Sequence, residues 1–106
     1  MSDWPGKWKL ENFEEALGEW AGGPVPSPEV LAEVEQWHYS LQDNPRGSDC
    51  EPFENQEGMF SDHFPMRCRV FTLRRHPLLV EGRPVVCYYE IQENEHRIVF
   101  SHFGLL

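Results

Sequence analysis

The sequence lacks the features of a membrane protein or of an exported one. It has no apolar run close to the roughly 18 residues that a membrane-spanning helix needs. The N-terminal residues Met1–Pro5 provide neither a basic start nor the apolar stretch of a signal peptide. We therefore expect a cytoplasmic protein that makes no contact with a membrane.

Recognised motifs for metal or small-molecule chemistry are missing too. Cys50, Cys68 and Cys87 form no CxxC pair, and no cysteine or histidine pair has a known metal-ligand spacing. No nucleophile elbow, phosphate-binding loop or close pair of carboxylates indicates a small-molecule enzyme. We expect no metal and no cofactor. Without an export signal we also expect reduced cysteines, with Cys68 and Cys87 acting as small core residues.

Basic residues are scarce, and they are unevenly placed along a chain whose net charge is −9. Residues 1–65 carry three basic side chains against fourteen acidic ones, a net charge of −11. Residues 66–106 carry six arginines against four glutamates, a net charge of +2. Nucleic-acid-binding domains are usually basic. The sequence therefore predicts a mildly basic part joined to a strongly acidic one.

Two helices are predicted in the acidic part. Asn12, with a glutamate three residues later, indicates a capping box that starts a helix over about 12–21. Ser27, followed by a proline, indicates the start of a second helix that runs to about residue 42. Apolar residues recur at helical spacing in both. His38 lies on the second apolar stripe, where it is either a hydrogen-bonded core histidine or a functional one.

Three runs rich in β-branched and aromatic residues follow, parted by turn-forming residues. They predict antiparallel strands within 66–75, 84–91 and 97–103. Short strands are also considered near Trp8 and near Met59. We expect a single domain over residues 1–106, made of a strand and helical part (7–42), an acidic loop (43–65) and an antiparallel sheet (66–103).

Alternation along each run predicts which of its own side chains share a face of that strand. The first face of each run holds, in turn, Met66, Cys68, Val70 and Thr72; Val85, Cys87, Tyr89 and Ile91; and Ile98, Phe100 and His102. The opposite face of each run holds, in the same order, Arg67, Arg69, Phe71, Leu73 and Arg75; Val86, Tyr88 and Glu90; and Val99, Ser101 and Phe103.

The predicted fold is α+β, with two N-terminal helices packed on a three- to four-stranded, mainly antiparallel sheet in the order β-α-α-β-β-β. This order over about 100 residues resembles the RelE/ParE toxin superfamily. Residues 34–45 resemble the second helix of those toxins, with its closing Leu and Pro turn. Arg83–Ile91 resembles their central strand, which commonly shows an Arg, two Val-like residues, a Tyr, a Glu and an Ile. Arg97–Phe100, followed by His102, resembles their closing strand. Taken together, the resemblance covers about residues 7–103.

The resemblance implies a function on nucleic-acid machinery. Some members of the family cleave mRNA in the ribosomal A site, others inhibit DNA gyrase, and most are neutralised by an antitoxin protein. Transferred to this sequence, it implies His102 and Arg83 as catalytic residues. The substrate-binding residues that it implies are Arg67, Arg69, Arg74, Arg75 and Tyr88. If the chain is an enzyme, we expect a ribonuclease-like toxin whose partners are RNA or the ribosome and an antitoxin.

The acidic part supports a different function. Ribosome-binding members of the family have a lysine-rich second helix, but Glu29, Glu33 and Glu35 stand there in this chain. Acidic surfaces steer association with basic proteins. The alternative is therefore a non-enzymatic inhibitor or adaptor that binds a basic target protein. In that case the arginines form a solvated sheet face and His102 is a surface histidine. The sequence leaves both functions and the oligomeric state open.

Overall fold

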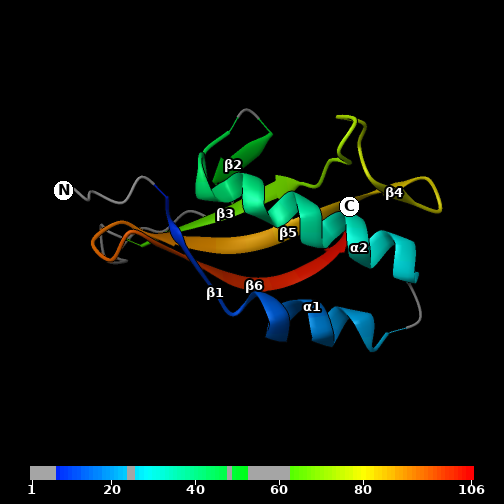
Figure 1. Ribbon diagram of the computed structural model, residues 1–106, viewed down its shortest axis with the longest axis horizontal. Helices are drawn as coiled ribbons and strands as arrows, with labels where there is room; N and C mark the ends of the chain where they lie inside the picture. Colours follow the sequence, from blue (N-terminus) through cyan, green and yellow to red (C-terminus); the bar gives the residue numbers. More distant parts are fainter. Residues whose placement is uncertain (1–6, 24–25, 48, 53–62) are drawn as a thin grey trace.

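The computed structural model describes residues 7–23, 26–47, 49–52 and 63–106, which form two helices against a mixed sheet (Figure 1). In chain order the elements are β1 (Lys9–Glu11), α1 (Phe13–Ala21), α2 (Pro28–His38), a 3-10 helix η1 (Tyr39–Gln42), β2 (Cys50–Pro52), β3 (His63–Arg69), β4 (Leu79–Val80), β5 (Arg83–Gln92) and β6 (Arg97–Leu105). The predicted α+β class is confirmed. Within the described residues, no helix is long and apolar enough to cross a membrane.

The sheet has the strand order β1-β6-β5-β3-β2, and β4 pairs with β5 beside this path. The predicted meander of three antiparallel strands is present as β3, β5 and β6. The strand expected near Trp8 is β1, which runs parallel to β6. The acidic loop expected over 43–65 was too wide, because β2 and the start of β3 lie inside it. The strand considered near Met59 lies outside the described residues.

Both helices cover the same face of the sheet (Figure 1). One core cluster joins Phe13 and Ala16 of α1, and Val34 and Trp37 of α2, to one face of the strands. That face contributes Met66, Cys68, Val85, Cys87, Tyr89, Ile91, Ile98, Phe100 and Phe103. The opposite face carries no helix from the described part of the chain, and we call it the open face.

The first predicted strand ends earlier than expected. Its pairing with β5 stops after Val70, whose N–H donates to the carbonyl of Val85. The chain then makes a tight turn at Thr72, where the Arg75 N–H donates to the Thr72 carbonyl and Arg75 adopts a φ of 70°. The expected alternation of Phe71, Leu73 and Arg75 with Arg67 is therefore wrong, because a turn has no strand faces.

One of the two predicted helix caps is confirmed. The Ser27 hydroxyl accepts a hydrogen bond from the Val30 N–H at the start of α2. The capping box at Asn12 is wrong, since Asn12 makes no side-chain cap and has a φ of 65°. Its Nδ2 instead donates to the carbonyl of Phe100, 2.9 Å away in β6. The side chain thus fastens the start of α1 to the sheet.

The expectation of three reduced cysteines is wrong for two of them. Cys50 lies directly opposite Cys68 across β2 and β3, and the two form a disulfide. Sequence reasoning missed this pair because it did not predict β2, whose pairing with β3 brings the two cysteines together. Cys87 is a free, fully buried thiol, and burial raises its pKa well above the ordinary value. Cys87 is the small core residue that the sequence predicted.

Candidate functional site

An irregularity in β6 places His102 on the open face. Tyr88 pairs with His102, but the next residue, Tyr89, pairs with Phe100, so Ser101 is an extra residue in β6. Such a bulge reverses the side-chain alternation beyond it. His102 therefore faces away from Phe100 and Ile98, contrary to the prediction that the three share a face, and Phe103 enters the core instead.

A row of four polar side chains then crosses the open face. Glu51 in β2 lies opposite Arg67 in β3, Arg67 opposite Tyr88 in β5, and Tyr88 opposite His102 in β6. Directly opposed side chains have Cβ atoms roughly 5 Å apart, so neighbours in the row are in contact range. We call these four residues the open-face row. The row brings together three of the residues that the sequence singled out.

His102 is held by two neighbours and remains exposed. Its ring stacks on Tyr88 with centroids 4.3 Å apart and planes 17° apart. The Ser101 hydroxyl lies 3.1 Å from Nδ1 of His102. These contacts orient the imidazole without burying it. A hollow of about 560 Å³ adjoins it, lined by Asn12, Pro65, Met66, Tyr88, Tyr89, Glu90, Val99, Phe100, Ser101 and His102.

Arg67 and Arg69 form the cationic end of the site. Both line a smaller hollow of about 180 Å³, together with Asp49, Cys50, Glu51, Val86 and Leu106. Arg67 donates to the Glu51 carboxylate through Nε, over 2.9 Å, and through Nη2. Hydrogen bonds to Glu51, and then to Tyr88, raise the pKa of Arg67. Its guanidinium thus links the acid at the sheet edge to the aromatic pair.

The structure does not bring the other predicted arginines to the row. Arg83 opens β5, five residues before Tyr88 and therefore roughly 16 Å along the strand. Its Nε donates to the carbonyl of Leu106. Arg74 and Arg75 are exposed in the turn after β3, and Arg75 lines a hollow shared with α2. The expected catalytic pair of His102 and Arg83 is thus separated, and Arg83 cannot reach a group bound at His102.

Sequence reasoning missed three residues of the site. Glu90 lies two residues beyond Tyr88 on the same face of β5, and this alternation could have identified it. Its carboxylate accepts a hydrogen bond from Gln92 and lies 3.7 Å from Nδ1 of His63. Ser101 depends on the bulge and Glu51 on the pairing of β2, and neither gives a signal in the sequence.

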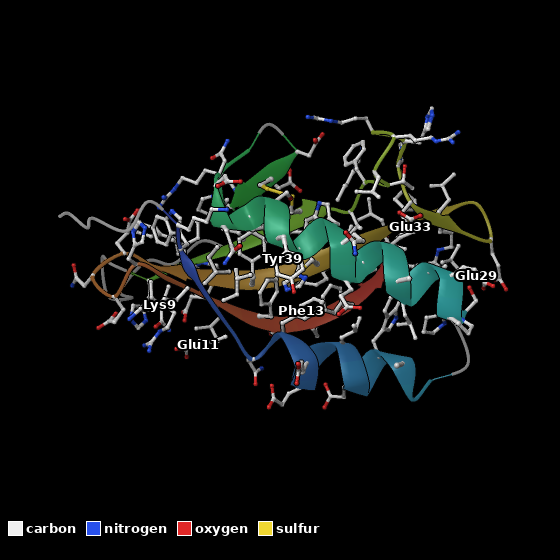
Figure 2. All side chains as sticks on the ribbon, viewed as in Figure 1. Lys9, Glu11, Phe13, Glu29, Glu33 and Tyr39 are labelled. Carbon is white, nitrogen blue, oxygen red and sulfur yellow. A yellow bond between two sulfur atoms is a disulfide. The ribbon has the colours of Figure 1, made fainter. Side chains whose placement is uncertain are left out.

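A second hollow of about 560 Å³ lies on the helical side of the molecule. Its lining consists of Leu10, Asn12, Phe13, Glu14, Glu15, Leu17, Glu35, His38, Tyr39 and Gln42. Phe13 and Tyr39 lie between α1 and α2 (Figure 2). His38 stacks on Phe13, with ring centroids 3.6 Å apart, and contacts the tilted ring of Tyr39, whose centroid is 4.1 Å away. We call this hollow the interhelical groove.

The rim of the interhelical groove is acidic. Glu14, Glu15 and Glu35 are exposed, and no ion pair between described residues involves them. Below them, His38 is 5% exposed, and its Nδ1 bonds to the carbonyl of Glu35. Burial lowers the pKa of His38, so its ring is neutral and adds no cation to the groove.

Comparison with known proteins gives no relative from which to transfer a function. No protein-family model, curated protein or solved structure matches the chain. Among the described residues, no group of three or more His, Cys, Asp or Glu side chains is placed to hold a metal ion. The site is therefore interpreted from its own geometry.

Proposed function

We propose that the chain acts on RNA as a RelE/ParE-like toxin and that the open face is its RNA-contacting surface. The observation that carries this proposal is the open-face row, in which Arg67, Tyr88 and His102 are neighbours on three adjoining strands. RNA recognition combines cations for phosphates with aromatic rings for unstacked bases. The row offers both, next to an exposed group that can transfer protons.

The proposed reaction is attack of a ribose 2′-hydroxyl on the adjacent phosphodiester. A base removes the 2′ proton, the new P–O bond forms, and the bond to the 5′ oxygen breaks as an acid protonates that oxygen. His102 and Glu90 line the same hollow and serve as the two proton-transfer groups. Arg67 and Arg69 stabilise the charge on the phosphate. The products are a 2′,3′-cyclic phosphate and a 5′-hydroxyl.

The distribution of charge supports this use of an acidic chain. The exposed glutamates of the helices include Glu14, Glu15, Glu19, Glu29 and Glu35. They belong to the layer that covers the other face of the sheet (Figure 1). Exposed charges separated by more than about 8 Å are largely screened at physiological salt. The helix glutamates therefore contribute little to the potential at Arg67 and Arg69, where the nearest acidic groups are Asp49 and Glu51.

Inducible expression in bacteria, with mapping of cellular mRNA ends, tests this function. We expect growth arrest and new 5′-hydroxyl ends. His102→Ala should lower the cleavage rate about 10²- to 10⁴-fold, and Arg67→Ala should also relieve the arrest. Arg74→Ala is the matched control because Arg74 lies in the turn, and it should remain toxic. Normal growth and unchanged mRNA ends at high levels of the folded wild-type chain would disprove the nuclease.

A second candidate function rests on the interhelical groove. Its acidic rim and aromatic floor are complementary to a cationic segment with apolar side chains. We propose that such a segment of a protein partner, either an antitoxin or a basic target, binds there.

Calorimetry with a synthetic peptide of alternating Arg and Leu provides the test. Glu15→Gln with Glu35→Gln should weaken binding at least about fivefold, which is roughly 1 kcal/mol. The control is Glu81→Gln with Glu95→Gln, two glutamates on turns remote from the groove, and this double variant should bind the peptide as tightly as the wild type does. Equal affinity in both double variants would exclude the groove.

A further inference from the structure

The strand β2 and the preceding Asp49 form an acidic strap at the edge of the open-face row. The acidic strap comprises Asp49, Cys50, Glu51 and Pro52, and three of these residues pair with β3. Its strand is three residues long and ends in a proline, which donates no backbone hydrogen bond. Such a short edge strand is held weakly by backbone pairing alone. Side-chain contacts must therefore supply much of its attachment.

One side-chain attachment is the ion pair between Glu51 and Arg67. A single oxygen of Glu51 accepts from both Nε and Nη2 of Arg67. These are the donors that an arginine offers to a phosphate group. Glu51 thus holds the position at Arg67 that an RNA phosphate needs. Its side chain is 55% exposed, so water competes for the pair and the contact is weak on its own.

The other attachment is the Cys50–Cys68 disulfide, one residue from Glu51. This bond fixes the register in which Glu51 faces Arg67. Cys50 is partly exposed and Cys68 is 4% exposed, so an incoming thiolate has better access to Cys50. Cys87 lies beside Cys68 in the next strand, but it is fully buried and stays protonated. Reduction of the disulfide therefore requires a thiol from outside the protein.

We propose that Glu51 is a built-in competitor for RNA phosphate at Arg67, and that the Cys50–Cys68 disulfide keeps it there until a dithiol reductant releases the strap. This inference concerns the regulation of the open-face row and rests on the function proposed above. In the first step the reductant's thiolate attacks Cys50, and Cys68 leaves and takes up a proton. The second thiol of the reductant then displaces Cys50 and forms the reductant's own disulfide. The step transfers two electrons and two protons to the protein.

Two measurements on the full chain, with and without dithiothreitol, test the proposal. The first is hydrogen exchange of the amides of Cys50 and Glu51, which should accelerate more than about tenfold on reduction because the strap opens locally. The second is the affinity for a short single-stranded RNA whose 2′-hydroxyls are methylated to prevent cleavage, which should rise about three- to tenfold as the competing carboxylate leaves. Cys50→Ser should reproduce both changes without reductant. Glu51→Gln should raise the affinity for RNA and leave the exchange of the strap amides unchanged.

Cys87→Ala is the control for a general effect of thiols, and it should respond to dithiothreitol as the wild type does. The proposal is overturned if reduction leaves the exchange of the strap amides unchanged. It is also overturned if dithiothreitol accelerates exchange in Cys50→Ser as much as in the wild type, because that variant has no disulfide to reduce. Two alkylatable thiols at Cys50 and Cys68 in the air-oxidised protein also overturn it. If no form binds RNA, the function on RNA fails, while the exchange data still show whether the disulfide holds the strap.

Discussion

At the scale of single residues, the local environment decides which of two similar groups is available for chemistry. His38 and His102 are both stacked on aromatic rings. His38 is 5% exposed and bonded to a backbone carbonyl, whereas His102 is exposed and borders a hollow. Of the two readings of His38 that the sequence left open, the packing favours the core histidine. The pair shows why residue type alone does not locate an active site.

The burial of His38 predicts a dependence of stability on pH. Burial lowers its pKa below the ordinary value of 6.5, so the unfolded chain takes up a proton that the folded chain excludes. The stabilisation is complete above pH 6.5 and decreases as the pH falls towards the lowered value. Urea unfolding at intervals between pH 8 and pH 5 should show this loss. His38→Phe should flatten the profile in that window, and an unchanged slope would contradict the assignment.

At the scale of elements, the β6 bulge determines which face carries the site. A strand without the extra residue at Ser101 would send His102 towards the helices and leave Phe103 exposed. The bulge region also makes a contact outside the ladder, because the Phe100 carbonyl accepts a hydrogen bond from Asn12. The link before α1 thus supports the position of a histidine ninety residues away in the sequence.

Substitutions at Asn12 test this support. Asn12→Ala removes the hydrogen bond and places a Cβ residue without a polar side chain at a φ of 65°, which together should lower the free energy of unfolding by about 1–3 kcal/mol. Asn12→Gly removes only the hydrogen bond, so its loss should be smaller. Chemical denaturation measures both. Equal stability of the wild type and Asn12→Ala would show that the contact is not a support.

At the scale of the whole molecule, the sequence predicted the layers well but the edges poorly. The helices and the β3-β5-β6 meander follow from strong periodicity and from turn residues. The two-residue β4, the three-residue β2 and the bulge are too short to produce a pattern, because long-range pairing determines them. The disulfide and Glu51 depend on β2, so they were missed for the same reason. The candidates Arg67, Tyr88 and His102 lie in one row across β3, β5 and β6, whereas the candidate Arg83 lies apart from that row.

The charges are also arranged on the scale of the molecule. The helix layer presents carboxylates around the interhelical groove, and the open face presents Arg67 and Arg69. One molecule thus has an acidic surface around the groove and, on the other side of its sheet, a surface on which Arg67 and Arg69 lie beside Asp49, Glu51 and Glu90. The two proposed functions therefore do not compete for the same residues, and each can be removed without touching the other.

A nuclear magnetic resonance titration of the reduced chain tests directly whether the open face binds RNA. The ligand is a single-stranded RNA whose 2′-hydroxyls are methylated, so that it is not cleaved. We predict that the imidazole signals of His102 and the ring signals of Tyr88 shift with added RNA, while those of Phe13 and Tyr39 in the interhelical groove stay in place. Shifts confined to the groove, or no shift at His102 at saturating RNA, would contradict it.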